Sequence, residues 1–132
     1  MAYTPNLPQT IVAFLAAQSI GAIWSSCSPD FGTASVVDRF AQIEPKVLIA
    51  SSTYSYNGKS KDKKQDVEEI ISQIPSIKHV VAIDDTFYDV AVGQKKWSEI
   101  KDKSLFRGKW KAIHYCSIFK DTVKYKKNKQ AE

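Results

Sequence analysis

The sequence lacks an apolar run long enough to cross a membrane. The longest run, Ile11 to Trp24, holds 14 residues and is interrupted by Gln18, Ser19 and Gly21, whereas a membrane-spanning helix needs about 20 apolar residues. No lysine or arginine precedes this run, although a secretory signal peptide begins with such residues. We therefore expect no membrane partner and a cytoplasmic protein.

Cysteine and histidine are scarce. The 132 residues include two cysteines, Cys27 and Cys116, and two histidines, His79 and His114. Two cysteines in a chain without a secretory signal indicate a reducing compartment and no disulfide framework. A zinc site needs three or four ligands, and no second cluster completes the pair formed by His114 and Cys116. We expect no metal site.

A basic surface is missing from most of the chain. Residues 1–57 carry 2 bases and 3 acids, residues 58–100 carry 7 and 8, and residues 101–132 carry 10 and 3. The net charge of +5 therefore comes from the last segment alone. The first hundred residues have no electrostatic footprint for nucleic acid. Lysines interleaved with aromatic residues in 101–132 leave one alternative open, a small non-catalytic binding module whose basic tail contacts nucleic acid or a protein partner.

Helices and strands alternate along the first hundred residues. A helix is predicted from Pro8 to just before Gly21, a second from Asp30 or Thr33 to just before Pro45, and a third over 67–74. Strands are predicted over 22–27, 47–50 and 79–83, with a polar loop over 51–61. In the first helix, residues spaced by three and four predict the buried stripe: Ile11, Val12, Leu15, Ala16 and Ser19.

This alternation predicts an α/β fold. Parallel strands need a long crossover, which each helix supplies. We expect a partial parallel sheet of three strands with flanking helices in one unit, residues 1–100, followed by a poorly ordered basic tail, residues 101–132. So small a layer leaves at least one sheet face or edge without cover.

Several ordered blocks are more specific than their periodicity. GAIWSSCSPDFG at 21–32 and DRFAQIEPK at 38–46 are preceded by PNLP at 5–8 and followed by YSYNGK at 54–59 and WSEI at 97–100. Together they resemble the N-terminal region of acetoacetyl-CoA synthetases, one family of the adenylate-forming acyl-CoA synthetases. The resemblance implies part of the N-terminal domain of the adenylate-forming fold.

The resemblance also implies an activity. These enzymes convert a carboxylic acid and ATP, with Mg, into an acyl-adenylate and pyrophosphate, and then transfer the acyl group to CoA. The implied small-molecule partners are acetoacetate, ATP and CoA. A Gly/Ser/Thr-rich loop with a lysine holds the ATP phosphates in the family, and this sequence contains no such run. We therefore expect no bound cofactor and no catalysis from this chain alone. A truncated or frame-shifted copy, an alternative product and a chain completed by another one all stay open.

One site is implied by the resemblance. In related synthetases a Gly-basic element follows the strand that corresponds to 47–50 and contacts the 3′-phosphate of CoA. The matching residues here are Tyr56, Asn57, Gly58 and Lys59. The alternative is that Lys59 is a solvated loop residue like the lysines around it. The run from Ser25 to Ser28 offers possible nucleophiles, but no histidine is near to activate one. It is better interpreted as a strand end of small residues.

Overall fold

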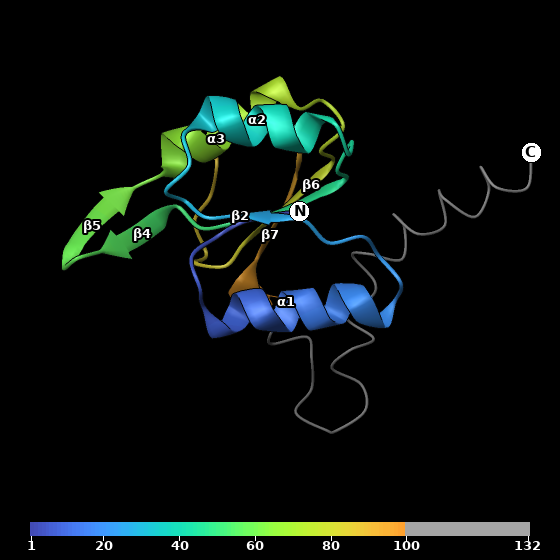
Figure 1. Cartoon of the computed structure of the whole chain (residues 1–132), viewed down its shortest axis with the longest axis horizontal. Coiled ribbons are helices and arrows are strands. Elements are labelled where there is room, and N and C mark those ends of the chain that lie inside the picture. Colours follow the sequence, from blue (N-terminus) through green and yellow to red (C-terminus); the bar gives the residue numbers. More distant parts are fainter. Residues whose placement is uncertain (100–132) are drawn as a thin grey trace, which may run out of the picture.

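The computed structural model describes residues 1–99, which form a five-stranded parallel sheet with helices on both faces (Figure 1). A two-stranded antiparallel hairpin projects from one end of this layer. The elements in chain order are β1 (Ala2–Tyr3), α1 (Pro8–Ser19), β2 (Ser26–Cys27), α2 (Thr33–Ala41), β3 (Val47–Ala50), β4 (Thr53–Tyr56), β5 (Lys59–Asp62), α3 (Lys64–Gln73), β6 (His79–Ala82) and β7 (Gly93–Lys96).

The sheet order is β2-β1-β3-β6-β7, and every neighbouring pair is parallel. β1 therefore lies between β2 and β3: Ala2 pairs with Ser26 on one side and with Ile49 on the other. From β1 the chain moves to one edge of the sheet and then returns past β1 toward the opposite edge. This reversal places a topological switch point between β1 and β3.

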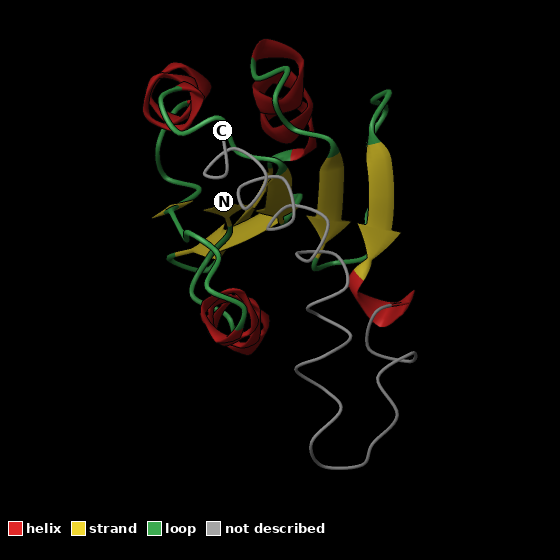
Figure 2. Cartoon of the chain, turned by 90° about the vertical axis from the view of Figure 1, so that its right-hand side faces the viewer, coloured by secondary structure: helices red, strands yellow, loops and turns green. Residues whose placement is uncertain are grey.

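Helices cover the two faces unequally. α2 and α3 lie together on one face, and α1 lies alone on the other (Figures 1 and 2). Alternate strand residues serve the two cores, as the period of a strand requires. In the first core, Val36 and Phe40 of α2 and Val67 and Ile70 of α3 pack with one set of strand residues: Tyr3, Leu48 and Val80. In the second core, Ala13, Ala16 and Ala17 of α1 pack with the other set: Ala2, Val47, Ile49 and Val81.

The predicted α/β class and the flanking helices are confirmed, but the sheet has five strands instead of three. β1 has only two residues, too few to show any period. β7 has the sequence Gly-Gln-Lys-Lys and is exposed along most of its length, so backbone pairing with β6 defines it. The strand expected over 22–27 is limited to Ser26 and Cys27.

The inward stripe predicted for α1 is wrong except at Ala16, which is buried. The helix buries Ala13, Ala16 and Ala17, while Ile11 is 58% and Leu15 59% exposed. Small side chains let the helix axis approach the sheet closely, and the large apolar side chains then point outward. The helix is apolar all round, so its periodicity alone could not tell its inner face from its outer one.

The segment expected to be a polar loop, 51–61, is mostly the β4–β5 hairpin. Its turn is Asn57-Gly58, with φ of 49° and 72°. Positive φ at both central residues is typical of a type I′ turn, whose twist suits a two-residue hairpin. Within residues 1–99 no helix has the length and apolar character that a membrane crossing demands.

Candidate functional site

An open cavity of about 650 Å³ lies at the carboxyl ends of the parallel strands. Residues that follow β1, β2, β3 and β6 line it, so the cavity sits at the switch point of the sheet, where open α/β sheets bind ligands. The lining residues are Pro5, Asn6, Leu7, Gln9, Ser28, Asp30, Ser51, Thr53, Tyr54, Ser55, Ile83 and Asp84.

Asp30 connects the turn after β2 to the hairpin. The Ser28 hydroxyl donates to Asp30 Oδ2 at 2.9 Å, and the Tyr54 hydroxyl donates to the same carboxyl group. These hydrogen bonds hold the pKa of Asp30 below its usual range, and the bond from Tyr54 has the larger effect. The same bond raises the pKa of Tyr54 to about 12. Asp30 does not cap α2, which begins after Gly32 without a side-chain cap. The Asp30 carboxylate instead accepts hydrogen bonds from Ser28 and Tyr54, which line the same cavity.

Asp84 connects the end of β6 to the start of the hairpin. Its Oδ2 accepts hydrogen bonds from Ser52 N and Ser52 Oγ, both at 2.7 Å, and from Thr53 N at 3.2 Å. Partial burial opposes ionisation, but the bonds from Ser52 and Thr86 outweigh it and hold the pKa of Asp84 below its usual range. The carboxylate therefore fixes the base of β4 against the sheet.

The cavity wall carries two carboxylates and no lysine, arginine or histidine. Hydroxyl and amide groups supply the rest of its polar surface, notably Asn6, Ser51 and Ser55. Such a wall suits a neutral group with hydroxyl or amino donors better than a phosphate, which attracts positive charge. Among residues 1–99 no three His, Cys, Asp or Glu side chains lie close enough together to hold a metal ion.

The predicted site residues lie beyond this cavity, at the tip of the hairpin. All four residues are exposed: Tyr56, Asn57, Gly58 and Lys59. The two-residue turn Asn57-Gly58 places Tyr56 directly opposite Lys59. The Tyr56 side chain is 65% exposed. Lys59 makes no ion pair with any residue of the described part of the chain.

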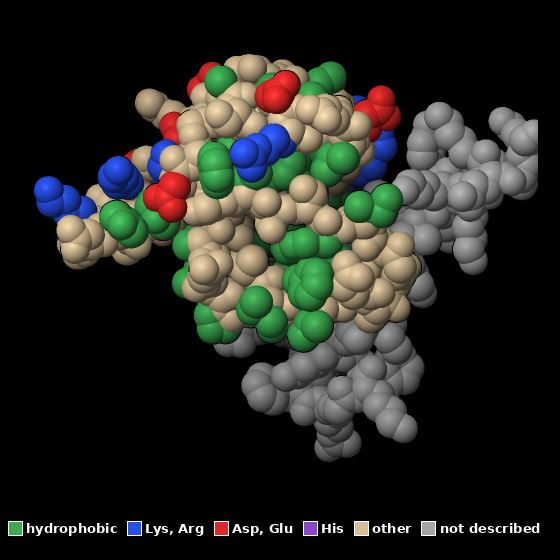
Figure 3. Space-filling view, in the orientation of Figure 1, with side chains coloured by type: hydrophobic (Ala, Val, Ile, Leu, Met, Phe, Trp, Pro, Cys, Tyr) green, Lys and Arg blue, Asp and Glu red, His purple; other side chains and the backbone are tan. Residues whose placement is uncertain are grey.

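One face of the hairpin carries both aromatic and cationic groups. The Tyr54 and Tyr56 rings are stacked, with centroids 6.2 Å apart and an interplanar angle of 15°. Their partners across the hairpin are Lys61 and Lys59, and residues directly opposite each other point to the same face. We call these four residues the Tyr–Lys face. Lysine side chains at this projecting end are visible in Figure 3.

The Tyr–Lys face and the cavity are continuous through Tyr54, which belongs to both. Strand residues rise about 3.3 Å each, so the turn lies roughly 10 Å beyond Tyr54. Sequence analysis found the turn residues but missed Tyr54, Lys61, Asp30 and Asp84. The alternation Tyr-x-Tyr, Asn-Gly, Lys-x-Lys was the available signal for a hairpin with two distinct faces.

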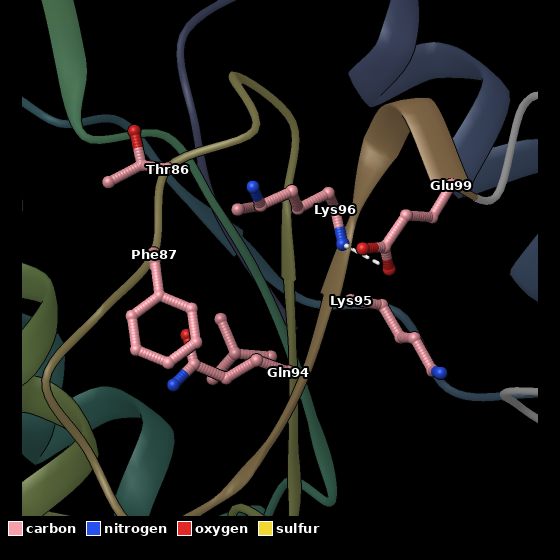
Figure 4. A pocket seen from close by; sticks show the side chains of 8 residues that line it. Thr86, Phe87, Gln94, Lys95, Lys96 and Glu99 are labelled. Carbon is pink, nitrogen blue, oxygen red and sulfur yellow. Dashed lines mark hydrogen bonds between the residues drawn. The ribbon is translucent and has the colours of Figure 1, made fainter.

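A second, smaller cavity of about 80 Å³ lies beside β7 (Figure 4). Phe87 and Gln94 line one side, and Lys96 and Glu99 line the other, where Lys96 N donates to Glu99 Oε2 at 3.4 Å. The Gln94 side chain already makes hydrogen bonds to the backbone of Tyr88. Its Oε1 accepts from Tyr88 N at 2.9 Å, and its Nε2 donates to Tyr88 O at 2.7 Å. This cavity has room for little beyond water.

The remaining sequence candidates do not form a site. Cys27 is buried at the end of β2, which agrees with the interpretation of 25–28 as a strand end of small residues. His79 begins β6 and is exposed on the surface. His114, Cys116 and the expected basic tail, 101–132, lie outside the described residues.

Comparisons with known proteins place this geometry in a family. The model of the family described as AMP-binding enzyme matches residues 1–128. The acetoacetyl-CoA synthetase of Xenopus tropicalis is 47% identical over 81 residues, 61% of this chain and 12% of that protein. The acetoacetyl-coenzyme A synthetase of Rhizobium meliloti (strain 1021) is 51% identical over 73 residues, 55% of this chain and 11% of that protein.

A solved structure gives the same result. The acetoacetyl-CoA synthetase from Streptomyces lividans superposes with a TM-score of 0.68 at 40% sequence identity, covering 74% of this chain and 15% of that one. The chain thus spans about an eighth of the length of the curated relatives it matches. Because the family model matches nearly the whole sequence, this chain belongs to the AMP-binding enzyme family.

Proposed function

We propose that this chain corresponds to the first part of an acid–thiol ligase that joins acetoacetate to CoA with ATP. The observation that carries the proposal is the 40% identity and common fold with the solved acetoacetyl-CoA synthetase. In the proposed reaction, acetoacetate and ATP give acetoacetyl-adenylate and pyrophosphate. The CoA thiol then displaces AMP to give acetoacetyl-CoA.

The proposed role of this segment is to bind the nucleotide end of CoA at the Tyr–Lys face. Lys59 and Lys61 place two positive charges beside an exposed tyrosine ring. A phosphate is attracted to the ammonium groups, and a purine base stacks on an aromatic ring. The residues present therefore fit this part of CoA.

ATP and its Mg ion do not fit the described residues in the same way. The cavity wall carries two carboxylates and no base, and those carboxylates already accept hydrogen bonds from Ser28, Tyr54 and Ser52. The sequence has no Gly/Ser/Thr-rich phosphate loop. We accordingly propose that the chain alone does not form the adenylate.

The CoA assignment is tested in a chimera. Residues 1–99 replace the matching segment of the Streptomyces lividans enzyme, and Lys59→Ala is introduced into that chimera. Losing one charge-assisted hydrogen bond is expected to raise the KM for CoA roughly tenfold without changing the KM for acetoacetate.

Lys64→Ala is the matched control, because Lys64 lies on α3 and faces Glu68 at 3.8 Å. An unchanged KM for CoA in the Lys59→Ala chimera contradicts the proposed CoA contact. A wild-type chimera that adenylates a different acid, but not acetoacetate, contradicts the proposed substrate. Acetoacetyl-CoA formed by the isolated chain contradicts its proposed inactivity.

A further inference from the structure

The β4–β5 hairpin stands apart from the parallel layer. Within residues 1–99 its two strands form a sheet of their own, separate from the five-stranded sheet, and they project from one end of it (Figure 1). An isolated two-stranded hairpin is marginally stable in water, so contacts at its base have to fix its direction. Lys59, which carries the proposed charge for CoA, lies at the far end beside the turn.

Ser52 is the corner at which the hairpin joins the rest of the molecule. The residue is 6% exposed and directly precedes β4. Its backbone N and its Oγ both donate to Asp84 Oδ2 at 2.7 Å. Its carbonyl O accepts from Lys63 N, directly after β5, at 2.6 Å. All three polar groups of Ser52 therefore serve the base of the hairpin, and they join the start of β4 to the end of β5.

Asp84 holds this corner from the main sheet. It follows the end of β6, and its Oδ2 accepts from Thr53 N at 3.2 Å in addition to the two bonds from Ser52. Ser52 Oγ gives its proton to Asp84, so Thr86 Oγ1, at 2.7 Å, donates to Ser52 Oγ. Hydrogen bonds to a carboxylate are stronger than those between neutral groups. One carboxylate thus ties the first residues of the hairpin to the sheet.

A second hydrogen bond reaches the hairpin farther out. The Tyr54 hydroxyl donates to Asp30, but Asp30 is exposed, and water competes for the oxygens of an exposed carboxylate. Asp84 is partly buried and bonds the backbone where the hairpin leaves the layer. The direction of the hairpin therefore depends on Asp84 more than on Asp30.

A small rotation at the base becomes a large displacement at the turn. Asn57 lies five residues beyond Ser52, which at about 3.3 Å per residue is roughly 16 Å. A rotation of about 10° then moves the turn by roughly 3 Å. A charged hydrogen bond from a lysine to a phosphate needs a distance of about 2.8 Å. A displacement of this size breaks such a bond.

We infer that Asp84 is a positioning residue for the nucleotide end of CoA: it sets the direction of the β4–β5 hairpin and, with it, the place of Lys59. Asp84 acts through Lys59 and not by contact with a phosphate. The inference rests on the proposed function for the identity of the ligand. The control of the hairpin's direction is a property of this chain and needs no ligand.

Double-mutant kinetics test the link between Asp84 and Lys59, in the chimera of residues 1–99 with the Streptomyces lividans enzyme. Asp84→Ala is expected to raise the KM for CoA roughly tenfold, with kcat and the KM for acetoacetate unchanged. When Lys59→Ala is already present, Asp84→Ala is expected to add less than about a twofold rise, because the lysine that it positions is gone.

Two further variants serve as controls. Asp84→Asn keeps one oxygen that accepts from Ser52, and it is expected to raise the KM for CoA only about threefold. Asp89→Ala is the matched control, because Asp89 is exposed in the same segment after β6 and its backbone N bonds Glu68 of α3. It is expected to leave the KM for CoA unchanged. Where Asp84→Ala fails to fold, Asp84→Asn decides by the same comparison.

Two kinetic outcomes overturn the inference. One is an equal rise in the KM for CoA on Asp84→Ala with and without Lys59, which shows that Asp84 does not act through the lysine. The other is an unchanged KM for CoA in Asp84→Ala when Lys59→Ala alone raises it. This second outcome leaves the proposed CoA contact intact, so the two proposals fail separately.

A distance measurement on the full chain tests the direction of the hairpin without any ligand. Nitroxide labels are attached at Ser60→Cys on β5 and at Ser72→Cys on α3, both exposed positions. The background carries Cys116→Ser, and Cys27 is buried. Asp84→Ala is expected to broaden the distribution of distances between the two labels, because the base of the hairpin is released.

The labels separate the inference from the proposed function. An unchanged distribution in Asp84→Ala overturns the inference, whatever the kinetics show. Equal broadening by Asp89→Ala overturns it too. A distribution broadened by Asp84→Ala alone, with a KM for CoA that Lys59→Ala does not change, supports the control of the hairpin by Asp84 and contradicts the proposed CoA contact.

Discussion

At the scale of single residues, two buried tyrosines differ in the state of their hydroxyl groups. The Tyr3 hydroxyl has one proton and two carbonyl acceptors within reach, Phe31 O at 3.0 Å and Pro29 O at 3.2 Å. The Tyr88 hydroxyl is equally buried and has no hydrogen-bond partner in the described part of the chain. Burial raises the pKa of both phenols, but only Tyr88 leaves a polar atom unsatisfied.

Removing these hydroxyls is therefore expected to have opposite effects. Tyr88→Phe relieves the desolvation of an unbonded group and is expected to stabilise the fold by up to about 1–2 kcal/mol. Tyr3→Phe removes the hydrogen bond that this hydroxyl donates and is expected to destabilise the fold by about 1 kcal/mol. Urea unfolding of both variants measures the difference. A loss of stability in Tyr88→Phe as large as that in Tyr3→Phe contradicts the interpretation.

Single residues were predictable from the sequence where their environment is local. The second and third helices were expected, and their apolar residues Val36, Phe40, Val67 and Ile70 are buried. Asp84 could not be assigned in this way, because Ser52, its main partner, lies 32 residues away. Tertiary structure alone brings them together.

At the scale of elements, the hairpin depends on its turn. Gly58 has φ of +72°, and no atom lies within 4 Å of the position that a Cβ would take. Gly58→Ala therefore strains the backbone without any steric clash. We expect the free energy that stabilises the hairpin against opening to fall by roughly 1–2 kcal/mol. Amide hydrogen exchange in β4 and β5 is then accelerated roughly 5- to 30-fold.

Gly58→Asn is the control, because asparagine tolerates positive φ better than alanine does. It is expected to show a smaller acceleration, with the exchange of β3 and β6 amides unchanged in both variants. Mass spectrometry of the peptides that cover 53–62 and 79–82 distinguishes the two regions. Equal exchange in the alanine and asparagine variants means that Gly58 is not the residue that sets the turn.

Among the strands, β3 and β6 were predictable from the sequence and β7 was not. β3 is a continuous apolar run and β6 has three apolar residues after His79, and both strands were expected. β7 has no apolar pattern because its residues are largely exposed, and its place depends on pairing with β6. The turn at Asn57-Gly58 has a strong local signal, but the polar residues around it favoured a loop over a hairpin.

At the scale of the whole molecule, the amino group of Met1 is enclosed by the fold. It donates to Val47 O at 2.8 Å, and burial lowers its pKa from 8.0 to about 5. In the unfolded chain this group binds a proton below pH 8, whereas in the folded chain it does so only below about pH 5. The unfolded state therefore binds more protons between these two values, and stability rises with pH across this window.

We expect the free energy of unfolding to fall as the pH is lowered from 8 toward 5, by up to about 1.4 kcal/mol per pH unit from this group. The measurement uses a His79→Gln/His114→Gln background, so that no histidine side chain contributes to the slope. Urea unfolding at several pH values gives the slope. A flat profile in the double variant contradicts a neutral, enclosed Met1 amino group.

The central place of β1 has a consequence for synthesis on the ribosome. β1 emerges before both of its neighbours, β2, at 26–27, and β3, at 49–50. The nascent chain therefore presents at least one unpaired edge of β1 until residue 50 has left the exit tunnel. β1 is thus synthesised before the strand that completes its pairing. During that interval its free edge is open to chaperones and to unpaired strands of other chains.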